Sequence, residues 1–202
     1  MRCLYRERRY ECGDYLEVDV YPVYKTAKQR NRQAKPTSEV QEKLNQRNSE
    51  RELIRVLNAN FTREDLEIHL TFEDHPLPES YEEAKRLSDN FMRRVKYRYN
   101  KAGIALKYVV VISGDETHRW HYHITLTGGI DRDELEALWP YGYANSRRLQ
   151  FNENGVEGLS RYISRQHLQE EGYERAKGRR RWFGSRNLVR PQPKEVTGAI
   201  SG

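Results

Sequence analysis

The strongest constraint on the fold is a short alternating run, Trp120-His-Tyr-His-Ile-Thr-Leu126. Successive side chains of a β-strand point to opposite faces, so His121 and His123 would share one face while Tyr122 and Ile124 take the other. Half of the histidines in the chain lie between positions 118 and 123. The run therefore predicts a strand with one apolar side and an imidazole pair that could bind a metal ion.

The residues around this run predict an antiparallel sheet covered by helices. Strand patterns occur at 66–72, 105–112 and 143–151, and helical patterns occur at 80–102, 131–139 and 155–169. The resulting order, β-α-β-β-α-β followed by a helix, is that of a ferredoxin-like or RRM-like α+β sheet with helices on one face. Such a sheet leaves its other face free for a nucleic acid.

The two ends of the chain are more strongly charged than this central stretch. Residues 1–60 predict an N-terminal extension with a strand at 15–24, a basic loop at 25–35 and a charged helix that begins near Ser38 and ends near Asn58. Residues 61–168 form the expected main domain. Residues 169–202 form a basic C-terminal tail in which Trp182 and Phe183 either dock on the core or are offered to bases.

The composition favours a polyanionic partner. The 202 residues include 36 Lys and Arg against 30 Asp and Glu, a formal net charge of +6. The two cysteines, both near the N-terminus, indicate neither a disulfide framework nor a CxxC metal motif. No apolar run is long enough to cross a bilayer, and the first residues are too charged for a signal peptide, so we expect a cytoplasmic protein without a membrane partner.

A histidine pair needs at least one further ligand to hold a divalent ion, commonly a carboxylate, with positions left open for substrate oxygens. The sequence offers candidates in the turn before the pair and on the first strand of the main domain: Asp115, Glu116, His118, Glu67 and His69. The alternatives are a closed structural zinc site and histidines that only stack on the sheet.

A second motif, Tyr162-Ile-Ser-Arg165, lies on the predicted helix 155–169. Its tyrosine and arginine are three residues apart and share a helix face, where a hydroxyl and a guanidinium could meet one phosphate. A phenol with a pKa of about 10 is a poor nucleophile, which a metal ion and an adjacent cation would offset. Taken alone, the motif also suits a ring packed on the sheet beside a solvated arginine.

Together these motifs resemble the HUH endonucleases, in particular the rolling-circle replication initiator (Rep) type of bacteria and their phages. The resemblance spans about residues 61–168 and rests on three ordered motifs: Ile68-His-Leu-Thr-Phe72, His121-Tyr-His123 and Tyr162-Ile-Ser-Arg165. It implies that His121 and His123 hold Mn²⁺ or Mg²⁺ and that Tyr162 attacks a single-stranded phosphodiester. The products would be a 5′-phosphotyrosine and a free 3′-hydroxyl.

The chain departs from the family pattern at two positions. Arg165 stands where a lysine is common, which keeps the charge but changes its geometry. Ser113 stands where many members have a glutamate as third metal ligand, so Glu116 or another group would have to substitute. The single tyrosine of the motif favours one nicking and joining cycle over strand transfer by a tyrosine pair.

The resemblance implies single-stranded DNA at a replication origin, in a hairpin, as the partner, and the bacterial cytoplasm as the location. The chain has no P-loop of the form GxxxxGK[ST], so a host helicase would unwind the duplex. Contacts to the strand are expected from basic and aromatic residues near the tyrosine and in the tail: Arg161, Arg179, Arg180, Arg181, Trp182 and Arg186.

Two other functions fit the same residues. One is a non-catalytic module that binds single-stranded nucleic acid on the sheet through stacking. The other is a different HUH enzyme, a transposase or a relaxase. Relaxases of the common type carry the tyrosine before the histidines, whereas Tyr162 follows them.

Overall fold

The computed structural model describes residues 4–23, 38–74, 77–114, 119–156, 159 and 182–199. The chain divides into two compact units. The central unit spans Phe61–Leu188, and the terminal unit combines Met1–Asn60 with Val189–Gly202. Of the expected C-terminal tail, the described residues therefore contribute to both units.

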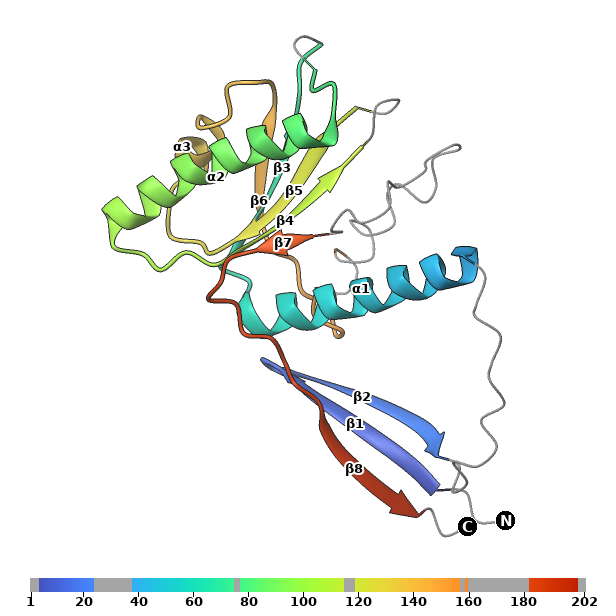
Figure 1. Ribbon diagram of the computed structural model, residues 1–202. Helices are drawn as coiled ribbons and strands as arrows, with labels where there is room; N and C mark the ends of the chain where they lie inside the picture. The colour runs from blue at the N-terminus through green and yellow to red at the C-terminus, as the bar shows by residue number, and fades with distance from the viewer. Residues whose placement is uncertain are drawn as a thin grey trace. The chain divides into compact units, whose positions relative to one another are not determined.

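The central unit is an antiparallel five-stranded sheet with helices (Figure 1). In chain order its described elements are β3 (Leu66–Thr71), α2 (Tyr81–Ala102), β4 (Tyr108–Ser113), β5 (His121–Leu126), α3 (Arg132–Glu136), β6 (Ala144–Arg148) and β7 (Phe183–Gly184). The strands lie in the order β6-β3-β5-β4-β7, and all neighbours are antiparallel. The predicted β-α-β-β-α-β order and the ferredoxin-like α+β fold are thus confirmed.

Helix α2 lies across one face of this sheet (Figure 1). It begins after Ser80, whose hydroxyl accepts a hydrogen bond from the Glu83 backbone N–H at 3.2 Å. It ends at Gly103, which adopts a φ of 69°, a left-handed conformation that favours glycine. Its inward side chains recur at helical spacing and join the core: Ala84, Leu87, Phe91, Met92, Val95 and Tyr99.

The strand register turns the histidines of β5 away from this core. Tyr122 and Ile124 are buried against α2, and the Tyr122 hydroxyl donates a hydrogen bond to the Ala84 carbonyl oxygen at 2.8 Å. Because side chains alternate along a strand, His121 and His123 lie on the opposite face, as predicted. We call that side of the sheet the histidine face.

β7, which follows β6 among the described strands of the central unit, pairs with β4 at the edge of the sheet opposite β6. Phe183 packs against the apolar core, and the Lys85 ammonium lies 5.3 Å from the centre of its ring. Of the two expectations for this segment, docking on the core is therefore correct for Phe183. Trp182, the residue before it, is half-buried.

The terminal unit is a three-stranded antiparallel sheet with a long helix. Its described elements are β1 (Leu4–Cys12), β2 (Tyr15–Val23), α1 (Ser38–Asn60) and β8 (Lys194–Ala199), with strand order β2-β1-β8. The strand β2 and the helix α1 were predicted, whereas β1 and β8 were not. Gly13 turns β1 into β2 with a φ of 64°, and a Cβ there would lie 2.5 Å from the Asn58 carbonyl oxygen of α1.

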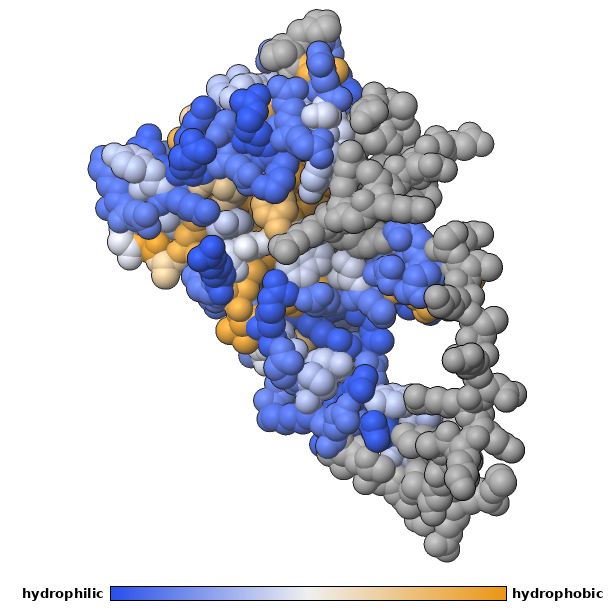
Figure 2. Space-filling view, in the orientation of Figure 1, coloured by the Kyte–Doolittle hydropathy of each residue, from blue (hydrophilic) through white to orange (hydrophobic). Residues whose placement is uncertain are grey.

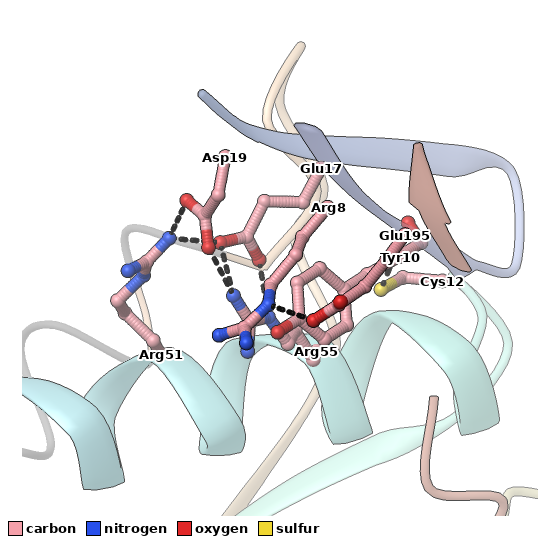
Figure 3. Close-up of polar contacts among 8 residues, drawn as sticks. All are labelled: Arg8, Tyr10, Cys12, Glu17, Asp19, Arg51, Arg55 and Glu195. Carbon is pink, nitrogen blue, oxygen red and sulfur yellow. Dashed lines mark hydrogen bonds and ion pairs between the residues drawn. The ribbon is translucent and has the colours of Figure 1, made fainter. Parts of the chain in front are cut away.

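Charged side chains join β2 to α1 (Figure 3). The Arg55 guanidinium contacts Glu17 at 2.7 Å and Asp19 at 3.2 Å, and Arg51 pairs with the same two carboxylates. Arg55 also lies 3.4 Å from the centre of the Tyr10 ring, a cation–π contact. Burial would raise the pKa of Glu17, but Arg55 and Arg51 outweigh burial and hold that pKa below its ordinary value.

The opposite face of this small sheet carries exposed apolar side chains, Leu16, Val18 and Val20. The face of the molecule drawn in Figure 2 is mainly hydrophilic, with apolar residues in scattered patches. Among the described residues, no helix combines the length and the apolar character that a membrane span needs.

Candidate metal centre

Three histidines from two neighbouring strands converge on the histidine face of the central sheet. His69 of β3 lies opposite His123 of β5 in the strand register. The ring centroids are 4.6 Å apart for His69 and His123, 5.4 Å for His121 and His123, and 5.5 Å for His69 and His121. One nitrogen from each ring lies within 4.8 Å of the other two. Metal–nitrogen bonds of about 2.1 Å put ligand atoms roughly 3 to 4 Å apart, so the group could bind a divalent ion after small rotations.

Acceptor oxygens lie near the outer nitrogens of two of these rings. His121 Nδ1 lies 3.1 Å from the Arg119 carbonyl oxygen, which can only accept a hydrogen bond, so Nδ1 carries the proton. His123 Nδ1 lies 3.5 Å from Glu67 Oε1, an ion-pair distance that is longer than a normal hydrogen bond. Metal-binding histidines ordinarily donate their outer N–H to a carbonyl or a carboxylate, which leaves Nε2 for the ion. His121 fits that pattern, and His123 would fit it after a small shift of its ring toward Glu67.

Glu67 is a buried carboxylate beside the histidines. Burial would raise its pKa, but His123 and Arg147 outweigh burial and lower the pKa below the ordinary value. Arg147 Nε donates a hydrogen bond to Glu67 Oε2 at 2.7 Å. Glu67 is therefore ionised at neutral pH and can accept the His123 proton in a hydrogen bond.

His69 is in the protonation state that a metal ligand needs. Burial, reinforced by His123 and His121, lowers its pKa from 6.5 to about 4, so the ring is neutral at neutral pH. Its Nε2 is buried and has no hydrogen-bond partner among the described residues. Buried polar atoms almost always have a partner, and a bound ion would supply one.

A cavity of about 800 Å³ lies beside the histidines. It is lined by His69, Thr71, Phe72, Glu73, Asp74, Arg119, Trp120, His121 and Tyr143. The Arg119 guanidinium is held at its rim by Asp74 at 3.1 Å and by the Phe72 carbonyl oxygen at 2.8 Å. The volume falls within the range of ligand sites, so a substrate could reach two of the three histidines.

The structure thus groups His121 and His123 with one of the five candidate third ligands, His69. A second candidate, Glu67, lies next to His123 rather than in the group of three. Ser113 is buried and lies opposite His121 in the register. The remaining candidates lie outside the described residues: Asp115, Glu116 and His118.

The tyrosine motif and most of the expected DNA contacts also lie outside the described residues: Arg161, Tyr162, Arg165, Arg179, Arg180 and Arg181. Arg186 is described and exposed. Sequence reasoning missed Tyr143 and Arg147. The strand pattern at 143–151 showed that they share a face, but nothing in the pattern showed that this face carries the histidines.

Residues 65–167 match the model of a protein family described as replication-associated protein. The matched range is just over half of the 202 residues, and it contains β3 to β6 together with the tyrosine motif. A comparison with curated proteins gave no match.

Proposed function

Because the chain belongs to this family of replication-associated proteins, we propose that it starts rolling-circle replication by nicking and rejoining single-stranded DNA. The observation that carries the proposal is the group of His69, His121 and His123, which lies inside the matched range. We assign the reaction to the HUH class, because a histidine pair on one strand precedes a tyrosine motif in the order that this class shows.

In this proposal the three histidines hold Mn²⁺ or Mg²⁺. The bound ion would polarise the scissile phosphate and stabilise the charge that develops there. Glu67 and the Arg119 carbonyl oxygen would keep His123 and His121 in the tautomer that offers Nε2 once the ion is bound. Glu116, which precedes β5 in the sequence, is a further candidate ligand.

Tyr162 is the proposed nucleophile, and Arg165 steadies the phosphate. The phenol loses its proton, its oxygen bonds to phosphorus, and the bond from phosphorus to the 3′-oxygen breaks. The released 3′-oxygen takes up a proton, and the strand's 5′ end stays on Tyr162 as a phosphodiester. The phosphodiester to Tyr162 replaces the phosphodiester to the 3′-oxygen. The same steps in reverse therefore rejoin the strand without an added energy source.

The proposed substrate is a hairpin at the replication origin, in the bacterial cytoplasm, with a host helicase to extend the unwinding. Arg161, the basic tail and the exposed Arg186 would contact its backbone. Such contacts release counterions, so binding should weaken steeply as salt rises.

A denaturing gel tests the proposal. The protein is incubated with labelled single strands from its own genetic neighbourhood, with Mn²⁺ or with EDTA. We expect a metal-dependent covalent adduct that disappears in Tyr162→Phe and His69→Ala. Tyr97→Phe is the matched control, because Tyr97 lies on α2 and its ring is exposed. Strands that bind without forming any adduct would instead identify a non-catalytic binding module.

A conservative substitution, Glu67→Gln, tests the role of Glu67. Glu67→Gln keeps the size of the side chain but removes the charge that holds His123. We expect metal binding about 10- to 100-fold weaker, as for other outer partners of metal-binding histidines. Isothermal titration with Mn²⁺ measures it. Unchanged affinity would rule out Glu67 as the group that orients His123.

A further inference from the structure

We propose that the edge strand β6 holds the single strand of DNA beside the metal centre, with the ring of Tyr143 stacked on a base. The inference rests on the proposed function, because it concerns the substrate of the same site. It adds the surface that the strand follows and the residue that holds a base.

The first observation is the position of β6. It is the edge strand next to β3, and its register sets Asn145 opposite His69 and Arg147 opposite Glu67. Alternation brings Tyr143 to the same face, and the Tyr143 carbonyl oxygen accepts a hydrogen bond from the Thr71 N–H at 2.8 Å. Tyr143, Asn145 and Arg147 are all exposed. These three residues, called the β6 row below, are therefore accessible and lie directly beside the buried part of the histidine site.

The second observation is the exposure of the Tyr143 ring. The residue is 70% exposed and lines the same cavity of about 800 Å³ as His69 and His121. Its contact with β3 uses the backbone, which any residue would supply, so the sheet does not need the ring. An exposed aromatic ring beside a cavity of mixed polar and apolar lining is a feature with which proteins stack unpaired bases.

The third observation is that Arg147, at the end of the β6 row, can contact a phosphate. Arg147 gives one N–H to Glu67, yet its side chain is 60% exposed and has further donors for a phosphate. Arg147 also lines a second cavity, of about 350 Å³, together with Phe151. The β6 row therefore extends from the first cavity to the second and presents the Tyr143 ring, the Asn145 amide and the Arg147 guanidinium. Only an unpaired strand exposes base faces to such a ring, so the occupant is single-stranded rather than duplex DNA.

Fluorescence anisotropy with a short labelled oligothymidylate in EDTA tests this inference, because EDTA prevents cleavage. We expect Tyr143→Ala to weaken binding between about 5- and 100-fold, the usual cost of losing one stacked base. Tyr143→Phe should bind nearly as well as wild type, because the ring remains. Tyr97→Ala is the matched control: Tyr97 is 64% exposed, but it lies on α2.

A second probe separates stacking from a structural effect. An abasic oligonucleotide has the same backbone without bases, so wild type and Tyr143→Ala should bind it equally. Wild-type affinity of Tyr143→Ala for oligothymidylate would overturn the inference and leave the proposed nuclease standing. Equal losses in Tyr143→Phe and Tyr143→Ala would also overturn it, because the hydroxyl would then be the important group. If the wild type bound no single strand at all, the proposed function would fall together with the inference.

Discussion

In the two sheets of this protein, one strand of each turns different side chains toward the helix of its own unit, apolar ones on β5 and charged ones on β2. In the central unit, Tyr122 and Ile124 of β5 face α2, and His121 and His123 of the same strand lie on the histidine face. In the terminal unit, Glu17 and Asp19 face α1, while Val18 and its apolar neighbours on β2 are exposed. Ion pairs respond to pH and salt, whereas apolar burial does so only weakly. The two units should therefore be destabilised by different changes.

The largest expected difference comes from truncating an equivalent apolar side chain in each sheet. Ile124 is fully buried, so Ile124→Ala leaves a cavity and should lower the free energy of unfolding by about 2 to 5 kcal/mol. Val18 is 42% exposed, so Val18→Ala should change it by no more than about 0.5 kcal/mol. Urea unfolding followed by circular dichroism measures both. Similar losses in the two variants would remove the contrast between the sheets.

A metal ion should sharpen the contrast, because the proposed ligands all belong to the central unit. An ion that binds the folded state alone adds about 2.7 kcal/mol at a concentration 100 times its Kd. We expect amide hydrogen exchange to slow in β3 and β5 but not in β1 and β2. Three imidazoles suit Mn²⁺ better than Mg²⁺, which prefers oxygen ligands, so Mg²⁺ should protect less.

His69→Ala is the control for this effect and should abolish the protection by Mn²⁺. Protection that survives in this variant would show that the ion binds elsewhere. Equal protection by Mg²⁺ and Mn²⁺ would argue against a site built from imidazoles alone.

The smallest effect concerns the ion pairs of the terminal unit. Arg55 and Arg51 lower the pKa of Glu17, so its charged form is favoured by folding. Its contribution is complete above the unfolded pKa and is lost as the pH falls through the folded pKa. Glu17→Gln should therefore cost about 1 kcal/mol at pH 7 and nothing at a pH below both values.

Unfolding in urea at several pH values measures this difference between Glu17→Gln and wild type. Glu11→Gln is the matched control, because Glu11 also lies in this sheet but pairs with Lys194 at the exposed surface. A Glu17→Gln deficit that is the same at every pH would show that size and packing, rather than charge, matter at this position.

The central sheet could be predicted because its signals are local. Ser80 and Gly103 mark the ends of α2, and the alternation around Tyr122 separates a core side from a histidine side within one strand. Both kinds of signal depend on residues a few positions apart, so the sequence contains them directly.

The third histidine could be named only as one of several candidates. Its position depends on how β3 is aligned with β5, and a shift by one residue would move His69 to the other face of the sheet. Such alignment is set by the packing of the whole core. For the same reason the sequence could not show that Tyr143 belongs to the histidine face.

The strands β1 and β8 were missed for two different reasons. β1 is rich in charged residues and has no apolar alternation, since arginines occupy both of its faces and glutamates one of them. β8 pairs with β1 across almost the whole chain, Leu4 opposite Ala199, and no local pattern reports so distant a partner. A charged strand becomes recognisable only when its oppositely charged neighbours are known, as Arg8 and Glu195 illustrate.

The pairing of β1 with β8 also sets an order of events during synthesis on the ribosome. All strands of the central unit leave the exit tunnel after β1 and before β8, so that unit can complete its sheet while β1 still has an unpaired edge. The hairpin of β1 and β2 must wait, with its hydrogen-bonding groups open to other chains, until residues 194–199 emerge. Translation that stops early, before β8, would release a finished central unit joined to an unfinished sheet.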